Sequence, residues 1–493
     1  MATFFSDQFG IDPNILDQHG LFNVSLITDL PLFIDPFLLF NSGRKEYRDL
    51  HDGMIRYLVF LRNKAQSGQV HDALLRAWYC FPEVKQTWLG FSAVGNSGAG
   101  LGMDFARALH GNLHTIFSEF GVEKVTASSH LEKICLIRDG VGRDNISDFT
   151  TNLIKGFLCE RTQEFALTYL AQDQRRVVSV SGSFFNFETE IWQPQKFTLP
   201  WADGDHVILT PKDLLTRDEN WINKGDLIRD FEELPTAIPD DQLRHQIDNY
   251  FHRVLARHRD REPNRTERAE AAVRTIHEFP ELIDYYIKFK EEHGGDAKNA
   301  SADKVFAAEQ LFVQQLKALQ LMLQAQTPFY AQGGTTYEEA HLRLAYLKDV
   351  IENKGGHRIF YVRRRPIKRE QDLHVMYRLV WIGTPSDVSA EVNDGRGPAD
   401  YKISRGVRDK TVVEMKLASN TQLKRNLQHQ AEAYQMASDA SAGIKAIMYF
   451  SYSEFLRVQK ILRDLGLDRH RDIVLIDARD DNKQSGSKIG VRR

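Results

Sequence analysis

The order of helical and strand-like segments between residues 369 and 478 constrains the fold more than any other feature of this chain. "REQDLHVMYRLVW" has the apolar spacing of a helix, and "DVSAEV", "ADYKIS" and "KTVVEMKL" follow it as three strands. A helix ("NLQHQAEAYQMA"), a strand ("IKAIMYF"), another helix ("SEFLRVQKILRDLG") and a last strand ("DIVLIDA") complete the segment. This order predicts one mixed sheet flanked by helices.

The rest of the chain is long enough to need further cores, because single cores stop growing at about 250–300 residues. We predict a multidomain α/β protein. Its expected parts are an N-terminal mixed α/β domain (residues 1–162), a β-rich extension (163–234), a helical region (235–330), the sheet domain (331–476) and a basic, disordered tail (477–493). The segment "KVFAAEQLFVQQLKALQLMLQAQ" has apolar residues at helical period, which favours a buried helix over a binding device.

Composition excludes several classes of protein. The chain is 42% hydrophobic and 27% charged, and no apolar run approaches the roughly 18 residues of a membrane helix. The N-terminus shows no basic segment followed by a long apolar one, so no secretory signal is expected. Three widely spaced cysteines give neither a disulfide framework nor a zinc knuckle. We expect a soluble, cytoplasmic protein with no membrane partner.

Charge is distributed unevenly along the chain. Residues 331–493 contain 29 Lys and Arg against 21 Asp and Glu, whereas the preceding residues contain 35 against 46. A basic domain can hold a polyanion through its phosphates, although a solvated surface would give the same excess. Arg396, Lys402, Lys424 and Arg425, and the run Arg363, Arg364 and Arg365, are candidate phosphate contacts by this criterion.

The stretch "GPADYKISRGVRDKTVVEMK" places acidic residues where a hairpin would bring them together. If its strands pair so that the two residue numbers add up to 814, Asp400 lies opposite Glu414, and Lys416 shares that face. Two close carboxylates repel unless a cation lies between them, and Mg²⁺ prefers such oxygen ligands. The backbone carbonyl of Met415 is a further candidate ligand. An ordinary charged hairpin would show the same residues, and a register shift of one would separate the acids.

These residues, in this order of elements and on a basic domain, resemble the PD-(D/E)XK nuclease superfamily, the restriction-endonuclease-like fold. The resemblance covers residues 337–476 and implies that Asp400 and Glu414 hold Mg²⁺, or Mn²⁺ in its place, for phosphodiester hydrolysis, with Lys416 positioning the nucleophile. It also implies an earlier acid, for which Glu391 is favoured over Glu370, and a helical pair, Gln430 and Tyr434. The pattern departs from the family at its proline, since Ala399 separates Pro398 from Asp400.

The expected function is a Mg²⁺-dependent endonuclease similar to predicted nucleases of bacterial phage defence; DNA is the favoured target, and the sequence leaves RNA open. We expect a homo-oligomer, a dimer or larger, so that two sites cut both strands. The residues before 331 are expected to detect a trigger or partner protein, or to assist assembly. A site-specific restriction endonuclease remains an alternative, and so does a non-catalytic nucleic-acid-binding or assembly protein.

Overall fold

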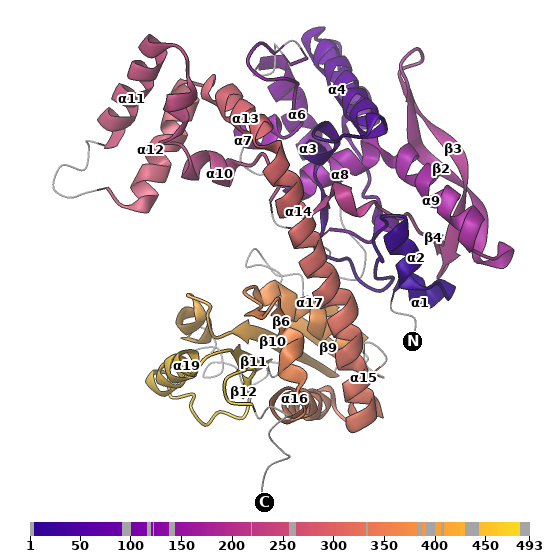
Figure 1. Cartoon of the computed structure of the whole chain (residues 1–493), viewed down its shortest axis with the longest axis vertical. Coiled ribbons are helices and arrows are strands. Elements are labelled where there is room, and N and C mark those ends of the chain that lie inside the picture. The colour runs from indigo at the N-terminus through magenta and orange to yellow at the C-terminus, as the bar shows by residue number, and fades with distance from the viewer. Residues whose placement is uncertain are drawn as a thin grey trace, which may run out of the picture.

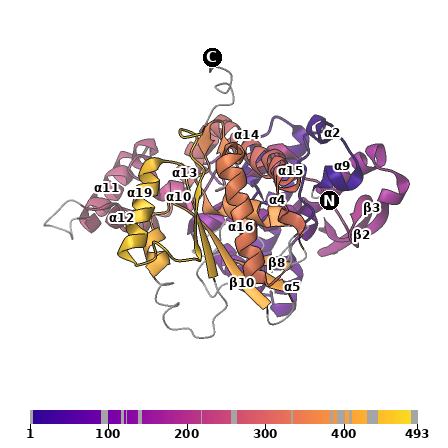
Figure 2. The ribbon, with the colours of Figure 1, turned by 90° about the horizontal axis from the view of Figure 1, so that it is seen from below.

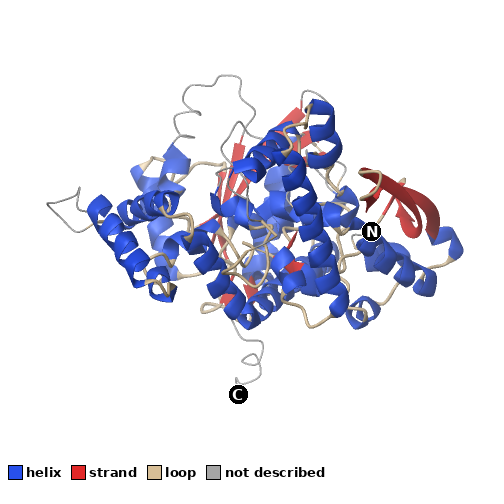
Figure 3. Cartoon of the chain, turned by 90° about the horizontal axis from the view of Figure 1, so that it is seen from above, coloured by secondary structure: helices blue, strands red, loops and turns tan. Residues whose placement is uncertain are grey.

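A computed structural model describes residues 4–90, 100–115, 120–121, 123–137, 143–217, 219–255, 263–331, 334–381, 384, 387–390, 400–405, 409–428 and 443–483. These residues form an N-terminal and a C-terminal body joined by a long helical rod (Figure 1). Helices dominate both bodies, and strands lie mainly in one C-terminal sheet and one N-terminal ribbon (Figure 3). The protein is therefore a mixed α/β chain with more than one folded unit, as predicted.

The N-terminal body is largely helical. Its helices are α1 (Phe5–Phe9), α2 (Pro13–Gln18), α3 (Pro36–Phe40), α4 (Lys45–Gln66), α5 (Asp72–Tyr79), α6 (Met103–Thr115), α7 (Lys133–Ile137), α8 (Arg143–Leu153) and α9 (Lys155–Tyr169). Helix α4 buries one face, which includes Tyr47, Met54, Leu58 and Leu61. Two short strands, β1 (Phe33–Ile34) and β5 (Leu215–Thr216), pair antiparallel.

A two-stranded ribbon lies on the side of this body (Figure 1). It consists of β2 (Arg175–Asn186) and β3 (Ile191–Ala202), and β3 also pairs with the two-residue β4 (Asp205–His206). The predicted domain boundary after residue 162 falls inside α9, whose apolar residues share a core with Phe197 and Leu199 of β3. The β-rich segment thus packs as part of the N-terminal body.

The helical region predicted between residues 235 and 330 is present. Its helices are α11 (Asp241–Leu255), α12 (Arg265–Glu278), α13 (Leu282–Glu292), α14 (Gly294–Glu309) and α15 (Leu316–Gln326). The short helix α10 (Lys224–Arg229) precedes them. A π-helical turn over Gln310–Gln315 joins α14 to α15, and the two form the rod in Figure 1. The apolar stripe of this rod, including Leu311, Leu316 and Leu319, is buried in the core, as predicted.

The C-terminal body follows the predicted order of elements wherever it is described. The elements are α16 (Thr336–Asn353), β6 (Tyr361–Val362), β7 (Arg365–Pro366), α17 (Glu370–Trp381), β8 (Asp387–Ala390), β9 (Asp400–Arg405), β10 (Asp409–Leu417), β11 (Gly443–Tyr449), α19 (Tyr452–Asp464) and β12 (Ile473–Asp477). A capping box between Thr335 and Glu338 begins α16. Residues 423–428 are helical, and the remainder of the helix predicted at 426–437 lies outside the described residues.

The five C-terminal strands form one mixed sheet in the order β12-β11-β10-β9-β8. β10, β11 and β12 are parallel, whereas β8 and β9 pair antiparallel with their neighbours. Helices α16 and α19 lie on opposite faces of this sheet (Figure 2). β10 is the central strand, and its apolar residues Val413, Met415 and Leu417, which share one face, are buried.

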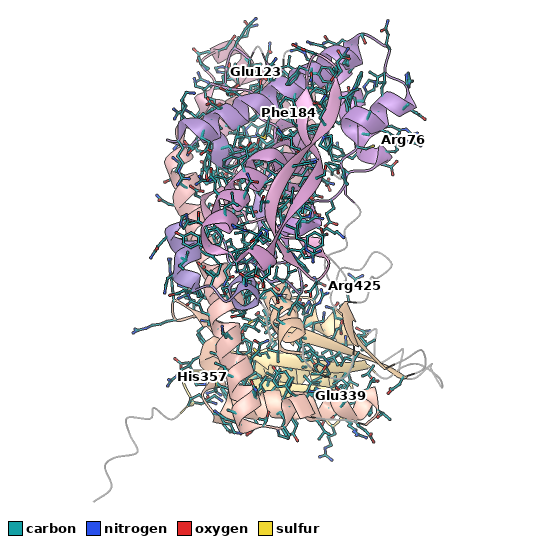
Figure 4. All side chains as sticks on the ribbon, turned by 90° about the vertical axis from the view of Figure 1, so that its right-hand side faces the viewer. Arg76, Glu123, Phe184, Glu339, His357 and Arg425 are labelled. Carbon is teal, nitrogen blue, oxygen red and sulfur yellow. The ribbon has the colours of Figure 1, made fainter. Side chains whose placement is uncertain are left out.

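An ion pair is buried within the C-terminal body. Arg343 Nη2 lies 2.7 Å from Glu339 Oε1 on α16, and both side chains are fully buried. The guanidinium also packs over the rings of Phe329 and Trp381. Figure 4 labels Glu339 inside this body. Among the described residues, no helix is long and apolar enough to cross a membrane.

Candidate active site

The β9–β10 hairpin has the register that the sequence predicts. Asp400 and Glu414 are direct partners, and the pairing continues to Asp409 and Arg405. Glu414 and Lys416 project from one face of β10, because side chains alternate along a strand, and the buried Val413 and Met415 project from the other. The structure describes the backbone of Asp400 but not its side chain, so only the place of this residue in the strand register is known.

Glu414, Lys416, Glu370 and Lys445 form a compact group of charges, which we call the acid–lysine cluster. Lys416 Nζ lies 3.2 Å from Glu414 Oε1 and 3.7 Å from Glu370 Oε2. Lys445 Nζ forms an ion pair with the other oxygen of the Glu414 carboxylate, Oε2. Both lysine side chains are only 5% exposed, and that of Glu414 is 15% exposed. Charges removed from water to this extent persist only when they are paired, so this cluster is an organised feature.

Three elements of the fold bring the cluster together. Glu414 and Lys416 come from β10, and Lys445 comes from β11, where it lies directly opposite Glu414 in the parallel ladder. Glu370 is the first residue of α17. Its Oε1 accepts hydrogen bonds from the backbone N–H of Leu417 (3.0 Å) and from Asn420 Nδ2 (2.8 Å). The first turn of α17 is therefore anchored at the carboxyl end of β10.

His374, one helical turn after Glu370, makes a second contact between α17 and β10. Its Nε2 lies 2.7 Å from the carbonyl oxygen of Met415. A carbonyl oxygen only accepts, so Nε2 carries the proton. Burial lowers the pKa of His374 below its usual value, which is consistent with a neutral ring. The Met415 carbonyl, predicted as a metal ligand, thus has one of its two lone pairs engaged by His374.

The loop after β10 is held by an exposed arginine of α19. The guanidinium of Arg457 donates to the carbonyl oxygens of Ala418 (3.2 Å) and Asn420 (2.8 Å). Asn420 in turn donates to Glu370. This connection fixes the loop at the carboxyl edge of the sheet, next to the acid–lysine cluster.

The structure places only some of the predicted site residues. It brings Glu414 and Lys416 together, with the Met415 carbonyl on the same strand end, and it adds Glu370, the alternative early acid. Glu391, Gln430 and Tyr434 lie outside the described residues, as do Arg396 and the side chain of Lys402. Lys424 and Arg425 are exposed, and Lys424 pairs with Asp464 at 3.3 Å. Figure 4 shows Arg425 at the end of the C-terminal body that faces the N-terminal one.

The donor chemistry of this region suits a divalent cation. Glu370 and Glu414 supply hard carboxylate oxygens, and the register places residue 400, another aspartate, directly opposite Glu414. Among the described side chains alone, no group of three or more His, Cys, Asp or Glu residues is arranged to hold a metal ion. A metal site of three carboxylates would therefore need Asp400 in addition to the two glutamates.

Three residues of this region were missed in the sequence: Lys445, His374 and Asn420. Lys445 had a signal, because it is one charged residue within the apolar strand "IKAIMYF", where a parallel strand covered on both faces is usually apolar throughout. His374 lies four residues after Glu370, on the same helical face. Asn420 had no comparable signal, because its contact depends on the path of a loop.

Two family models match parts of the chain. One is a domain of unknown function (DUF8370) over residues 10–223, and the other is a domain of unknown function (DUF8371) over residues 336–452. The second match begins at Thr336, where α16 begins, and includes the described hairpin and the acid–lysine cluster. No curated protein and no solved structure matches the sequence. The function must accordingly be inferred from the geometry of the site.

Proposed function

We propose that this chain is a metal-dependent nuclease whose C-terminal body is a restriction-endonuclease-like domain. The observation that supports it most strongly is the pairing of Asp400 with Glu414 on adjacent strands, with Lys416 paired to Glu414. An incidental surface hairpin would not need to bury its lysine between two carboxylates. The order of elements from α17 to β12 and the mixed five-stranded sheet are compatible with that fold.

Each residue of the cluster has a role in this proposal. Asp400, Glu414 and Glu370 would hold Mg²⁺ or Mn²⁺. When bound, the metal would lower the pKa of a water molecule and offset negative charge on the phosphate. Lys416 would orient the attacking water through its ammonium hydrogens. Hydrolysis then adds the water oxygen to phosphorus and breaks one ester P–O bond, and the leaving oxygen takes up a proton.

We propose Glu370, in place of Glu391, as the early acid of the site. Its Oε2 lies near Lys416, whereas its Oε1 is held by two donors, Leu417 N–H and Asn420 Nδ2. A carboxylate oriented in this way is fixed relative to β10 before any ligand arrives, so the binding group is preorganised.

The proposed substrate is DNA, and the proposed biological role is that of an effector in bacterial antiphage defence. The N-terminal body and the helical rod would supply a trigger-sensing, partner-binding or assembly function, and two copies would place two sites on a duplex. A site-specific restriction endonuclease would use the same chemistry and differ in leaving discrete fragments.

One observation favours a second candidate, a nucleic-acid-binding or assembly protein that does not cut. Lys416 and Lys445 each pair with a different oxygen of Glu414, so this carboxylate is already compensated by two lysines of the chain. In a nuclease, a metal would have to share that carboxylate with Lys445. In a binding protein, the same contacts would be structural.

A cleavage assay on plasmid, linear duplex, single-stranded DNA and RNA, with Mg²⁺, Mn²⁺ or EDTA, separates these candidates. Asp400→Asn and Glu414→Gln should abolish metal-dependent cutting. Lys290→Met is a matched control, because Lys290 is also 5% exposed and pairs with an acid, Asp226, at 2.5 Å, but belongs to α13. Nucleic-acid binding without cutting by the wild-type chain, unchanged in both site variants, would instead support the binding protein.

A further inference from the structure

The β6–β7 hairpin and the residues after it, which we call the basic hairpin (residues 361–368), have an unusual backbone. Val362 pairs with Arg365, so Arg363 and Arg364 form the two-residue loop between the strands. Both have positive φ angles, 49° and 64°. Positive φ at both central residues is the feature of a type I′ turn, for which Asn-Gly is the favoured sequence.

Arginine is a poor choice for these two positions. A side chain with a Cβ is disfavoured in the left-handed region, and such residues persist where the surroundings or a function require them. Arg363 has a partial explanation, since Nη2 lies 3.0 Å from Asp303 and the guanidinium packs over Phe306 of α14. This ion pair is at the surface, with side chains 57% and 65% exposed, and such pairs contribute little to stability.

The other cations of the basic hairpin have no such explanation. The side chains of Arg364, Arg365 and Lys368 are exposed, and they make no ion pair or hydrogen bond with any residue that the structure describes. Four cations thus lie within six residues, and a turn sequence with lower strain would remove two of them. A partner with negative charge outside the chain would account for this concentration of cations.

The basic hairpin lies at the same edge of the sheet as the acid–lysine cluster. Tyr361 Oη donates to the carbonyl oxygen of Ala478, just after β12, and its ring packs against Phe450, just after β11. Glu370 is bonded to Leu417 at the end of β10. Because β10, β11 and β12 are parallel neighbours, their carboxyl ends form one edge, and β10 and β12 are about 10 Å apart at the usual strand spacing. Figure 1 shows β6 beside α17 and β10.

We propose that the basic hairpin binds the phosphate backbone of the nucleic acid that reaches the acid–lysine cluster, with Arg364 and Arg365 as its principal contacts. This inference rests on the proposed function for the identity of the polyanion. Consecutive phosphates of one DNA strand are separated by about 3.4 Å along a duplex. The distance of about 10 Å between the ends of β10 and β12 therefore corresponds to about three nucleotides. The contact would position the strand and carry no sequence information.

The test measures binding of the full-length chain to fluorescent duplex DNA, single-stranded DNA and RNA in EDTA, over a series of salt concentrations. The first variant combines Arg363→Asn with Arg364→Gly, which removes two charges and supplies the sequence that a type I′ turn favours. Arg363→Lys with Arg364→Lys preserves the charges, and Asp303→Asn breaks the surface pair without removing an arginine. Arg365→Gln removes one charge outside the turn, so the proposal can be tested even if the double variant misfolds.

The Asn-Gly variant should melt at or above the wild-type temperature. It should bind duplex DNA at least about tenfold more weakly near 0.1 M salt. The slope of log K against log salt should become less steep by roughly 0.9 for each arginine removed. Arg365→Gln should lose about one such unit, and the lysine and Asp303→Asn controls should bind like the wild type. Wild-type affinity and slope in both charge-removing variants would overturn the proposal. If the wild-type chain still cuts nucleic acid in that case, the nuclease assignment stands without it. A loss seen equally with RNA would support the backbone contact and remove any preference for DNA.

Discussion

Lys445→Met tests whether the acid–lysine cluster is organised as the structure indicates. The substitution keeps a stem of similar length and removes the charge that pairs with Glu414 Oε2. Removing one partner of a buried ion pair costs about 3–5 kcal/mol, because the other charge is left buried. Glu414 keeps Lys416 at 3.2 Å, so we expect a smaller loss, about 2–3 kcal/mol in the local stability of β10 and β11.

Hydrogen exchange followed by mass spectrometry measures this loss where it occurs, which a global melt of a chain with several units does not. Amides in β10 and β11 should exchange roughly 30- to 150-fold faster in Lys445→Met than in the wild type. Lys290→Met, which breaks a comparable pair with Asp226, should leave β10 and β11 unchanged.

A double-mutant cycle with Glu414→Gln isolates the pair itself. If Lys445 and Glu414 interact directly, the double variant should be more stable than the sum of the single effects predicts, by about 1–3 kcal/mol. If the two single losses of stability add within about 0.5 kcal/mol, the pairing is refuted, and Lys445 does not offset the charge of the Glu414 carboxylate.

Three further predictions concern Arg343, Glu370 and Asp29. Arg343→Met should destabilise the C-terminal body by about 3–5 kcal/mol, measured by hydrogen exchange in α16, because it removes the guanidinium that pairs with the fully buried Glu339, and adding Glu339→Leu should restore part of the loss. Glu370→Gln keeps an acceptor for Leu417 and Asn420, so its melting temperature should stay close to that of the wild type while metal-dependent cleavage falls at least tenfold. Burial raises the pKa of Asp29 to about 8, so the folded state retains a proton that the unfolded state loses near pH 4, and stability should fall as pH rises from 5 to 8. Asp29→Asn should remove up to about 1.4 kcal/mol per pH unit of that dependence, and an unchanged profile would contradict it.

Much of the C-terminal fold could be predicted because its information is local. Alternation in "KTVVEMKL" and the apolar run "IKAIMYF" define β10 and β11, and the short connection at "RGVRD" restricts the hairpin register. The opposition of Asp400 and Glu414 follows from these features. Lys416 as a partner of Glu414 then follows from strand periodicity, since residues two apart share a face.

The remaining features depend on tertiary contacts. Lys445 meets Glu414 only because β11 pairs parallel to β10 with one particular register, and Glu370 approaches because α17 docks at the end of β10. Neither relation is set by neighbouring residues. The change from helical to strand-like periodicity near residue 162 likewise says nothing of packing, and α9 and β3 on either side of it share one core.

The most direct test of the nuclease assignment is a time course of end-labelled DNA cleavage by the wild-type chain and by Lys416→Met, in Mg²⁺, in EDTA, and in EDTA followed by excess Mg²⁺. The assignment predicts cutting by the wild type that EDTA stops and Mg²⁺ restores, and a loss of at least about 100-fold in Lys416→Met, the usual effect of removing a preorganised hydrogen-bond donor from a reaction centre. Equal cutting by the wild type and Lys416→Met, or cutting that EDTA leaves unchanged, would contradict it.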